Sequence, residues 1–113
     1  MKTIKFLLLT IILLLTSCEK IDKDCPDCIL KQTREFIKGQ HCDEGASVSE
    51  WLFQGEHVFM FSDGTCGADF GATVLDQYCE FVGNLGGFTG ALTINGIDFY
   101  QNATRIKTIW KQN

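Results

Sequence analysis

Two cysteines near the start of a helical pattern have a spacing that could do chemistry. Cys25 and Cys28 are separated by Pro26 and Asp27, where an amphipathic segment begins. The positive end of a helix dipole lowers the pKa of a nearby thiol, and two thiols at this spacing can exchange with a substrate disulfide. This part of the sequence is therefore compatible with thiol–disulfide exchange.

The sequence around Cys25 and Cys28 weakens that interpretation. The four residues resemble a glutaredoxin-type active-site tetrad, but a thioredoxin-like fold needs a strand before the motif, and a charged segment precedes it here. These two cysteines, with His41 and Cys42, have the ligand types of a zinc site. However, His41 and Cys42 are neighbours in the sequence, and adjacent residues rarely both reach one metal. We therefore expect these cysteines to form structural disulfides.

Other candidate sites lack essential parts. Residues 63–69 place oxygen ligands at alternate positions, as in a calcium loop, but no bidentate glutamate follows, so a capped turn is favoured. His57 falls in an expected strand on its solvated face, and no serine lies in a nucleophile elbow. We therefore expect no enzyme activity, no metal and no cofactor.

Cys18 ends a pattern typical of lipid attachment. The basic residues Lys2 and Lys5 precede a ten-residue apolar run over residues 6–15, and Leu15-Thr16-Ser17-Cys18 resembles the lipobox of bacterial lipoproteins. In such proteins the thiol is alkylated with diacylglycerol, and cleavage leaves the cysteine as the new N-terminus. As a helix the run spans about 15 Å, half of a roughly 30 Å hydrocarbon core, which favours a signal peptide over a permanent span.

Composition after the expected signal peptide describes one small acidic domain. The 96 residues from Cys18 onward carry eight basic and fourteen acidic residues, a formal net charge of −6. This balance argues against nucleic acid and against peripheral binding to anionic lipid. The aromatic residues provide enough material for a core, so we predict a signal peptide over 1–17, a lipidated tether over 18–24 and one globular domain over 25–113.

Five cysteines follow Cys18, so at least one cannot pair within the chain. They are Cys25, Cys28, Cys42, Cys66 and Cys79. Export would place them in an oxidising compartment where disulfides persist. Among about fifteen possible pairings, short loops favour Cys66–Cys79 and Cys28–Cys42, with Cys25 left over.

The chain before residue 47 contains one predicted helix. Residues 19–24 are charged, without apolar periodicity, and are expected to be mobile. Pro26 and Asp27 suit a first helical turn, apolar residues recur at helical spacing, and Gly39 is a natural stop. We predict an amphipathic helix over 26–38.

The second half of the chain predicts a small antiparallel sheet. Residues 48–53 and 56–61 flank Gln54-Gly55, and residues 92–94 and 97–99 flank Asn95-Gly96, the preferred pair of a type I′ turn. Residues 105–110 alternate as a last strand, whereas residues 73–82 are compatible with either a helix or a loop. The expected fold is α+β, with one N-terminal helix packed on a small, mainly antiparallel, disulfide-stabilised sheet.

Four stretches together resemble a family of short, uncharacterised lipoproteins from Bacteroidetes-type bacteria. They are residues 48–61 with the turn Phe53-Gln54-Gly55, the Cys66 segment, residues 76–79, and residues 85–90. The resemblance covers most of residues 25–113 and implies a membrane anchor and a single domain, without a known activity. Members often carry a doubled cysteine near Cys66 and another near Gly83, and because this chain has neither, no disulfide pattern is transferred.

We therefore expect a lipid-anchored module of the outer membrane, on either its periplasmic or its surface face. Its partners would be the membrane, through the lipid on Cys18, and a protein, peptide or glycan ligand, but no nucleic acid. The alternative is an envelope thiol–disulfide protein that uses Cys25 and Cys28.

Overall fold

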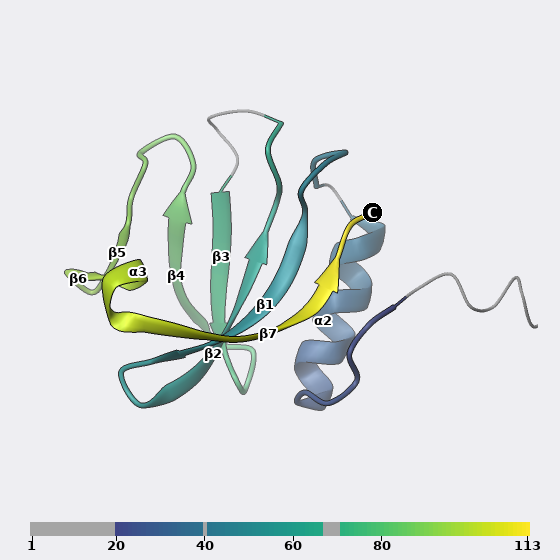
Figure 1. Ribbon diagram of the computed structural model, residues 1–113, viewed down its shortest axis with the longest axis horizontal. Helices are drawn as coiled ribbons and strands as arrows, with labels where there is room; N and C mark the ends of the chain where they lie inside the picture. Colours follow the sequence, from purple (N-terminus) through teal and green to yellow (C-terminus); the bar gives the residue numbers. More distant parts are fainter. Residues whose placement is uncertain (1–19, 40, 67–70) are drawn as a thin grey trace, which may run out of the picture.

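The computed structural model describes residues 20–39, 41–66 and 71–113. A five-stranded antiparallel sheet has the strand order β4-β3-β2-β1-β7, and β5 pairs with β6 in a separate hairpin (Figure 1). The helix α2 (Asp27–Lys38) packs on this sheet, which confirms the expected α+β fold with an N-terminal helix and disulfides. The remaining elements are β1 (Ser47–Phe53), β2 (Glu56–Ser62), β3 (Gly71–Asp76), β4 (Phe81–Gly86), β5 (Thr93–Ile94), β6 (Ile97–Asp98), α3 (Phe99–Asn102) and β7 (Ala103–Lys111).

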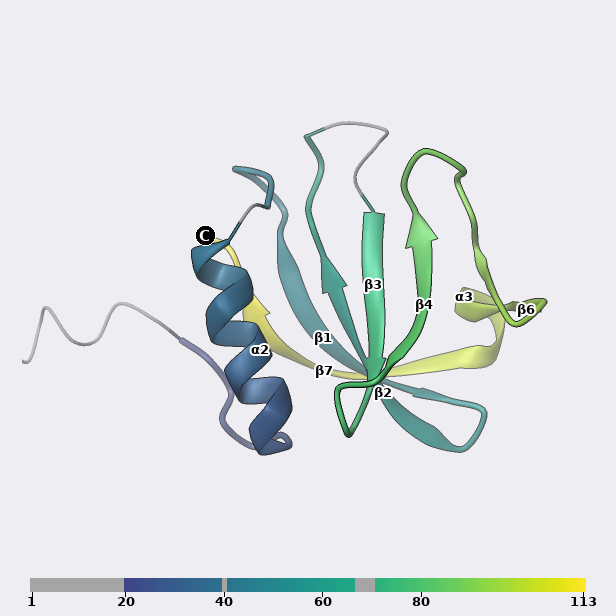
Figure 2. The same ribbon diagram turned by 180° about the vertical axis from the view of Figure 1, so that it is seen from behind.

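The chain crosses from one edge of the sheet to the other. Strands β1 to β4 follow each other as neighbours, and β7 then pairs with β1 at the opposite edge. Figures 1 and 2 show α2 at one end of the sheet and β5, β6 and α3 at the other. Neither helix in the described part of the chain combines the length and the apolar character needed to cross a membrane.

Two separate cores lie on the two faces of the sheet. Successive residues of a strand point to opposite faces, so Phe59 belongs to one core and Met60 to the other. The α2 core comprises Ile29, Ala46, Val48, Phe59, Phe61, Ile109 and Trp110. The α3 core comprises Phe53, Val58, Met60, Ala72, Val74, Leu85, Ile94 and Phe99.

The elements with the clearest sequence patterns are present. Helix α2 begins after Pro26, carries Asp27 in its first turn and Lys38 in its last, and ends at Gly39. The first hairpin is present as predicted, and its register pairs Val48 with Phe61. Strand β7 extends the predicted last strand at both ends.

Both turn predictions are also confirmed. Gln54 and Gly55, between β1 and β2, have φ values of 53° and 79°. Asn95 and Gly96, between β5 and β6, have φ values of 53° and 78°. These are the left-handed conformations that a type I′ turn requires at both central positions.

Residues 73–82 form neither a helix nor an irregular loop. They contain the end of β3, a tight turn and the start of β4, with Val74 paired to Gly83. The Asp76 carboxylate accepts hydrogen bonds from the backbone N–H groups of Tyr78 and Glu80. Two strands separated by a short turn reproduce the three- and four-residue spacing of a helix, which explains the ambiguity.

Residues 20–24 are not the free tether that the sequence predicts. The Asp22 N–H donates to the carbonyl oxygen of Ile109 at 2.8 Å, so this segment docks on the outer edge of β7. Ile21 packs against the α2 core. The sequence did not reveal this docking, because Lys107, which donates a hydrogen bond to the Asp24 carbonyl oxygen, lies 83 residues from Asp24 in the sequence.

Candidate functional site

A cavity of about 540 Å³ lies between the start of α2 and the central strands of the sheet. Its wall combines charged, apolar and thiol side chains, which is the composition expected of a ligand site. The lining residues are Asp24, Cys25 and Pro26 before α2, Glu50, His57 and Phe59 from β1 and β2, Gln77 from the β3–β4 turn, and Ile106 and Lys107 from β7.

Glu50 is a nearly buried carboxylate in this wall. Strand β1 lies between β2 and β7, so Glu50 is flanked by Phe59 on one side and Lys107 on the other. Only 9 % of the residue is exposed. Its Oε2 lies 2.8 Å from Nδ1 of His57, whose side chain is 52 % exposed. A carboxylate held in this way can accept hydrogen bonds from a ligand at the cavity floor.

Lys107 joins the segment before α2 to the sheet. Its Nζ lies 3.2 Å from Oδ2 of Asp22 and donates to the Asp24 carbonyl oxygen at 2.6 Å. Desolvation lowers the pKa of Lys107, but the hydrogen bond to Asp22 and the surrounding carboxylates outweigh it, so the net shift is upward. The Asp24 N–H and the Lys107 ammonium lower the pKa of Asp22. Both groups are therefore charged at neutral pH.

Cys25 supplies a free thiol to the same cavity. Its pKa is raised, first by desolvation and then by the charges of Asp22, Glu50 and Asp24, which Lys107 only partly offsets. The reactive form of cysteine is the thiolate. The cavity therefore keeps this thiol protonated and weakly nucleophilic at neutral pH.

The four other described cysteines form two disulfides. The bonds join Cys28 to Cys79 and Cys42 to Cys66. The sequence correctly predicts which four cysteines pair and which one is left over, but the preferred pairing, Cys66–Cys79 and Cys28–Cys42, is wrong. Short loops favoured that pairing, whereas the fold places the start of α2 beside the β3–β4 turn, 51 residues away in the sequence.

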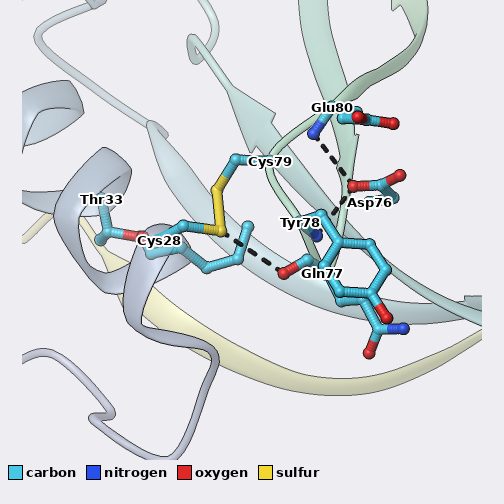
Figure 3. Close-up of a disulfide and its surroundings, with 8 residues drawn as sticks. Cys28, Thr33, Asp76, Gln77, Tyr78, Cys79 and Glu80 are labelled. Atoms are coloured by element: carbon cyan, nitrogen blue, oxygen red, sulfur yellow. Dashed lines mark hydrogen bonds between the residues drawn. A yellow bond between two sulfur atoms is a disulfide. The ribbon is translucent and has the colours of Figure 1, made fainter.

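Figure 3 shows how the Cys28–Cys79 bond joins the helix to that turn. Cys79 has a positive φ of 64° in the turn, and Cys28 Sγ lies 3.4 Å from the Gln77 carbonyl oxygen. Hydrogen bonds to the Asp76 carboxylate hold the same turn. Because Gln77 also lines the cavity, this disulfide fixes one wall of the candidate site.

The structure does not assemble the zinc ligands that the sequence suggested. Cys28 and Cys42 belong to different disulfides, and the nitrogens of His41 lie near the carbonyl oxygens of Cys42 and Ile37. Within residues 20–39, 41–66 and 71–113, no three potential ligands are grouped to hold a metal ion. The possible calcium loop over 63–69 lies partly outside the described residues, and Cys18 lies wholly outside them.

The sequence did not predict that Glu50, His57 and Lys107 lie together. His57 is exposed, as its strand position predicts, but it also contacts Glu50. A glutamate two residues from the buried Val48 on the same strand face was the available signal. Lys107 is placed beside Glu50 only by the β1–β7 register, and that register contains two irregularities.

Comparison with known protein families identifies a domain in this chain. A family model described as a domain of unknown function (DUF6970) matches residues 34–112. This range contains both cysteines of the Cys42–Cys66 bond, whereas Cys25 and Cys28 precede it. Neither the curated proteins nor the solved structures contain a match.

Proposed function

The chain belongs to the DUF6970 family, and from that premise we propose that it is a lipid-anchored lipoprotein of the cell envelope that acts as a binding module. The lipid is carried by Cys18 and holds the domain at the outer membrane, as in the short Bacteroidetes-type lipoproteins that the sequence resembles. The ligand is a protein, peptide or glycan. The proposal includes no catalytic step.

The cavity beside Glu50 is the observation that supports a binding role. It combines a nearly buried carboxylate, a charged lysine and the apolar side chains of Phe59 and Ile106. Such a mixture gives a ligand both apolar contact and oriented polar partners. The free thiol in its wall has a raised pKa, which favours binding over nucleophilic chemistry.

The anchor is tested on the native protein. The mass of its N-terminal peptide should correspond to an acylated Cys18, and Cys18→Ala should move the protein out of the membrane fraction. Cys25→Ala is the matched control and should leave the protein in the membrane fraction. An unmodified Cys18 in the mature protein, or an unchanged membrane fraction for Cys18→Ala, would contradict the anchor.

The binding role is tested by site-specific crosslinking in cell envelopes. A photoreactive residue at Ile106, which lines the cavity and is 43 % exposed, should give discrete adducts. The same residue at Leu92, which is 52 % exposed and does not line the cavity, is the control. The Ile106 adducts should disappear with Glu50→Gln, and equal adducts from both positions would contradict a cavity-specific ligand.

The second candidate is a thiol–disulfide protein that uses Cys25 and Cys28. One observation favours it, because a free thiol lies three residues from a disulfide-bonded cysteine. Exchange would require the Cys25 thiolate to attack the Cys28–Cys79 bond and release the Cys79 thiolate. The protein should then accelerate insulin reduction by dithiothreitol, which supplies the electrons, and an unchanged rate with Cys25→Ser would exclude this candidate.

A further inference from the structure

The charges of this chain are strongly segregated along the sequence. Residues 39–104 contain no lysine or arginine but carry nine aspartates and glutamates. All eight basic residues after Cys18 lie in two short stretches, residues 20–38 and residues 105–111. The net charge of −6 therefore averages two regions of opposite character.

The fold brings the two basic stretches together. Residues 20–24 dock on β7 through the Asp22–Ile109 and Lys107–Asp24 hydrogen bonds. Helix α2 packs against β7 through the α2 core, which contains Ile29 and Ile109. Figures 1 and 2 show α2, the docked segment and the C-terminal end of β7 at one end of the molecule.

We name the exposed basic side chains at this end the basic face. On α2 they recur at three- and four-residue spacing, which places them on one side of the helix, away from the buried Ile29 and Thr33. The exposed acidic residues nearby are Asp24, Asp27 and Glu35, with Asp43 and Glu44 in the connection that follows α2. Residues 18–38 and 105–113 together still carry a formal charge of +3, against −9 for residues 39–104. The members of the basic face are Lys20, Lys23, Lys31, Arg34, Lys38 and Lys111.

The docked segment keeps the basic face close to the attachment point of the lipid. Asp22 is already bonded to β7, and the four residues of chain from Cys18 to Asp22 reach at most about 14 Å. The Debye length at physiological ionic strength is about 8 Å. A free tether would let the domain move beyond this range, whereas the docked one holds it within roughly two screening lengths of the headgroups.

We propose that the basic face lies against a surface of anionic lipid headgroups and sets the orientation of the anchored domain. This inference rests on the proposed lipid on Cys18, which provides retention, whereas the basic face provides the orientation. The acidic strands β1 to β4 and their connections then point away from the membrane. Glu50 and Lys107 place the cavity at the border between the two regions, where a ligand can reach it from the side.

Amine labelling of the acylated protein in vesicles tests this orientation. The protein is reconstituted in phosphatidylcholine with or without phosphatidylglycerol, and acetylation of Lys31 and Lys38 is followed by mass spectrometry. The attraction of each basic side chain to a nearby anionic surface is strong enough to slow its labelling about fivefold. We expect that slowing only with phosphatidylglycerol, with reversal at high salt, while carbodiimide labelling of the exposed Glu56 at the start of β2 stays constant.

Two variants of equal net charge distinguish the effect of the basic face from the effect of the overall charge. The triple change K31Q, R34Q and K38Q should abolish the lipid-dependent protection of the remaining lysines Lys20, Lys23 and Lys111. The triple change T89E, T93E and Q101E, at exposed positions remote from the basic face, should leave that protection unchanged.

Three outcomes would overturn the orientation. They are unprotected lysines on both vesicle types, equal protection on both types, which would indicate a covering partner other than anionic lipid, and equal loss of protection in the two triple variants. The mass of the N-terminal peptide is recorded on the same samples. An acylated protein without lipid-dependent protection contradicts the orientation alone, whereas an unacylated Cys18 contradicts the proposed anchor.

Discussion

The two faces of the sheet are covered in different ways. On the α3 side the cover is apolar, and Phe99, which is fully buried, contacts the rings of Trp51, Phe53 and Tyr100. On the α2 side only Ile29 and Thr33 of the twelve helix residues are buried. The helix is held there by the Cys28–Cys79 disulfide as well as by packing.

This difference explains where the candidate site lies. Burying one large apolar side chain contributes about 1.5–3 kcal/mol, and on α2 only Ile29 is a fully buried apolar residue, with Phe36 and Ile37 partly buried. Packing therefore provides only part of what holds the helix. A covalent bond can retain such a helix without a complete apolar interface. The interface on the α2 side leaves the cavity beside Glu50, whereas the α3 side contributes mainly to stability through its apolar core.

The largest expected effect on stability follows from disrupting the α3 core. Phe99→Ala removes the central aromatic side chain of the α3 core and should lower the free energy of unfolding by about 3–5 kcal/mol. Urea denaturation followed by tryptophan fluorescence measures this change. Tyr100→Ala is the matched control, because Tyr100 is 49 % exposed. A loss of unfolding free energy for Phe99→Ala no larger than for this control would contradict the central place of Phe99 in the α3 core.

The next effect tests whether α2 depends on its disulfide. Replacing Cys28 and Cys79 together by serine opens a bond between residues 51 apart and should cost about 2–4 kcal/mol. Hydrogen exchange should become fast throughout α2, whereas β2 and β3 should keep their protection. Uniformly faster exchange across the sheet would show that the two covers are not independent.

A smaller effect is expected from the other disulfide, which joins two loops. Cys42 and Cys66 are 24 residues apart, so loop closure alone predicts a cost about 0.7 kcal/mol below that of the Cys28–Cys79 bond. The double serine variant should increase exchange near residues 42–46 and leave α2 protected. Loss of protection in α2 would mean that both bonds support the same cover.

The sequence predicted the elements whose information is local. Alternating apolar residues around Gln54-Gly55, the Asn95-Gly96 turn and the apolar stripe of α2 each contain their own signal. Residues 73–82 were ambiguous because a β-turn between two strands mimics helical spacing. The turn that distinguishes them depends on hydrogen bonds to Asp76, which spacing alone does not reveal.

The candidate site was much less predictable, because its parts come from distant segments. Cys79 lies beside Cys28 because the sheet positions the β3–β4 turn there, and Lys107 meets Asp22 and Asp24 because β7 pairs with β1. A short-loop preference for disulfides and the expectation of a mobile tether both fail for this reason. Both predictions rest on separation along the chain, whereas the fold brings residues 22–28 beside residues 77–79 and 107–109.

The smallest effect concerns the docked segment on the α2 side and is a local change with pH. The Asp24 N–H and Lys107 lower the pKa of Asp22 below its ordinary value of 3.8. A lowered folded-state pKa stabilises docking fully above 3.8, and this contribution is lost as the pH falls through the lower folded-state value. The Asp22 amide resonance, followed by NMR, should therefore move only below pH 3.8, while α3-side resonances stay fixed.

Lys107→Gln sharpens this test because it removes only one of the two causes. The Asp24 N–H, which is the larger cause, remains, so the pKa of Asp22 should rise but stay below 3.8. If Asp22 in the unchanged protein titrates at or above 3.8, the segment is not held as described. Because orientation at a lipid surface needs the docked segment, Lys107→Gln should also weaken the lipid-dependent protection of Lys31 and Lys38 without altering the α3 core.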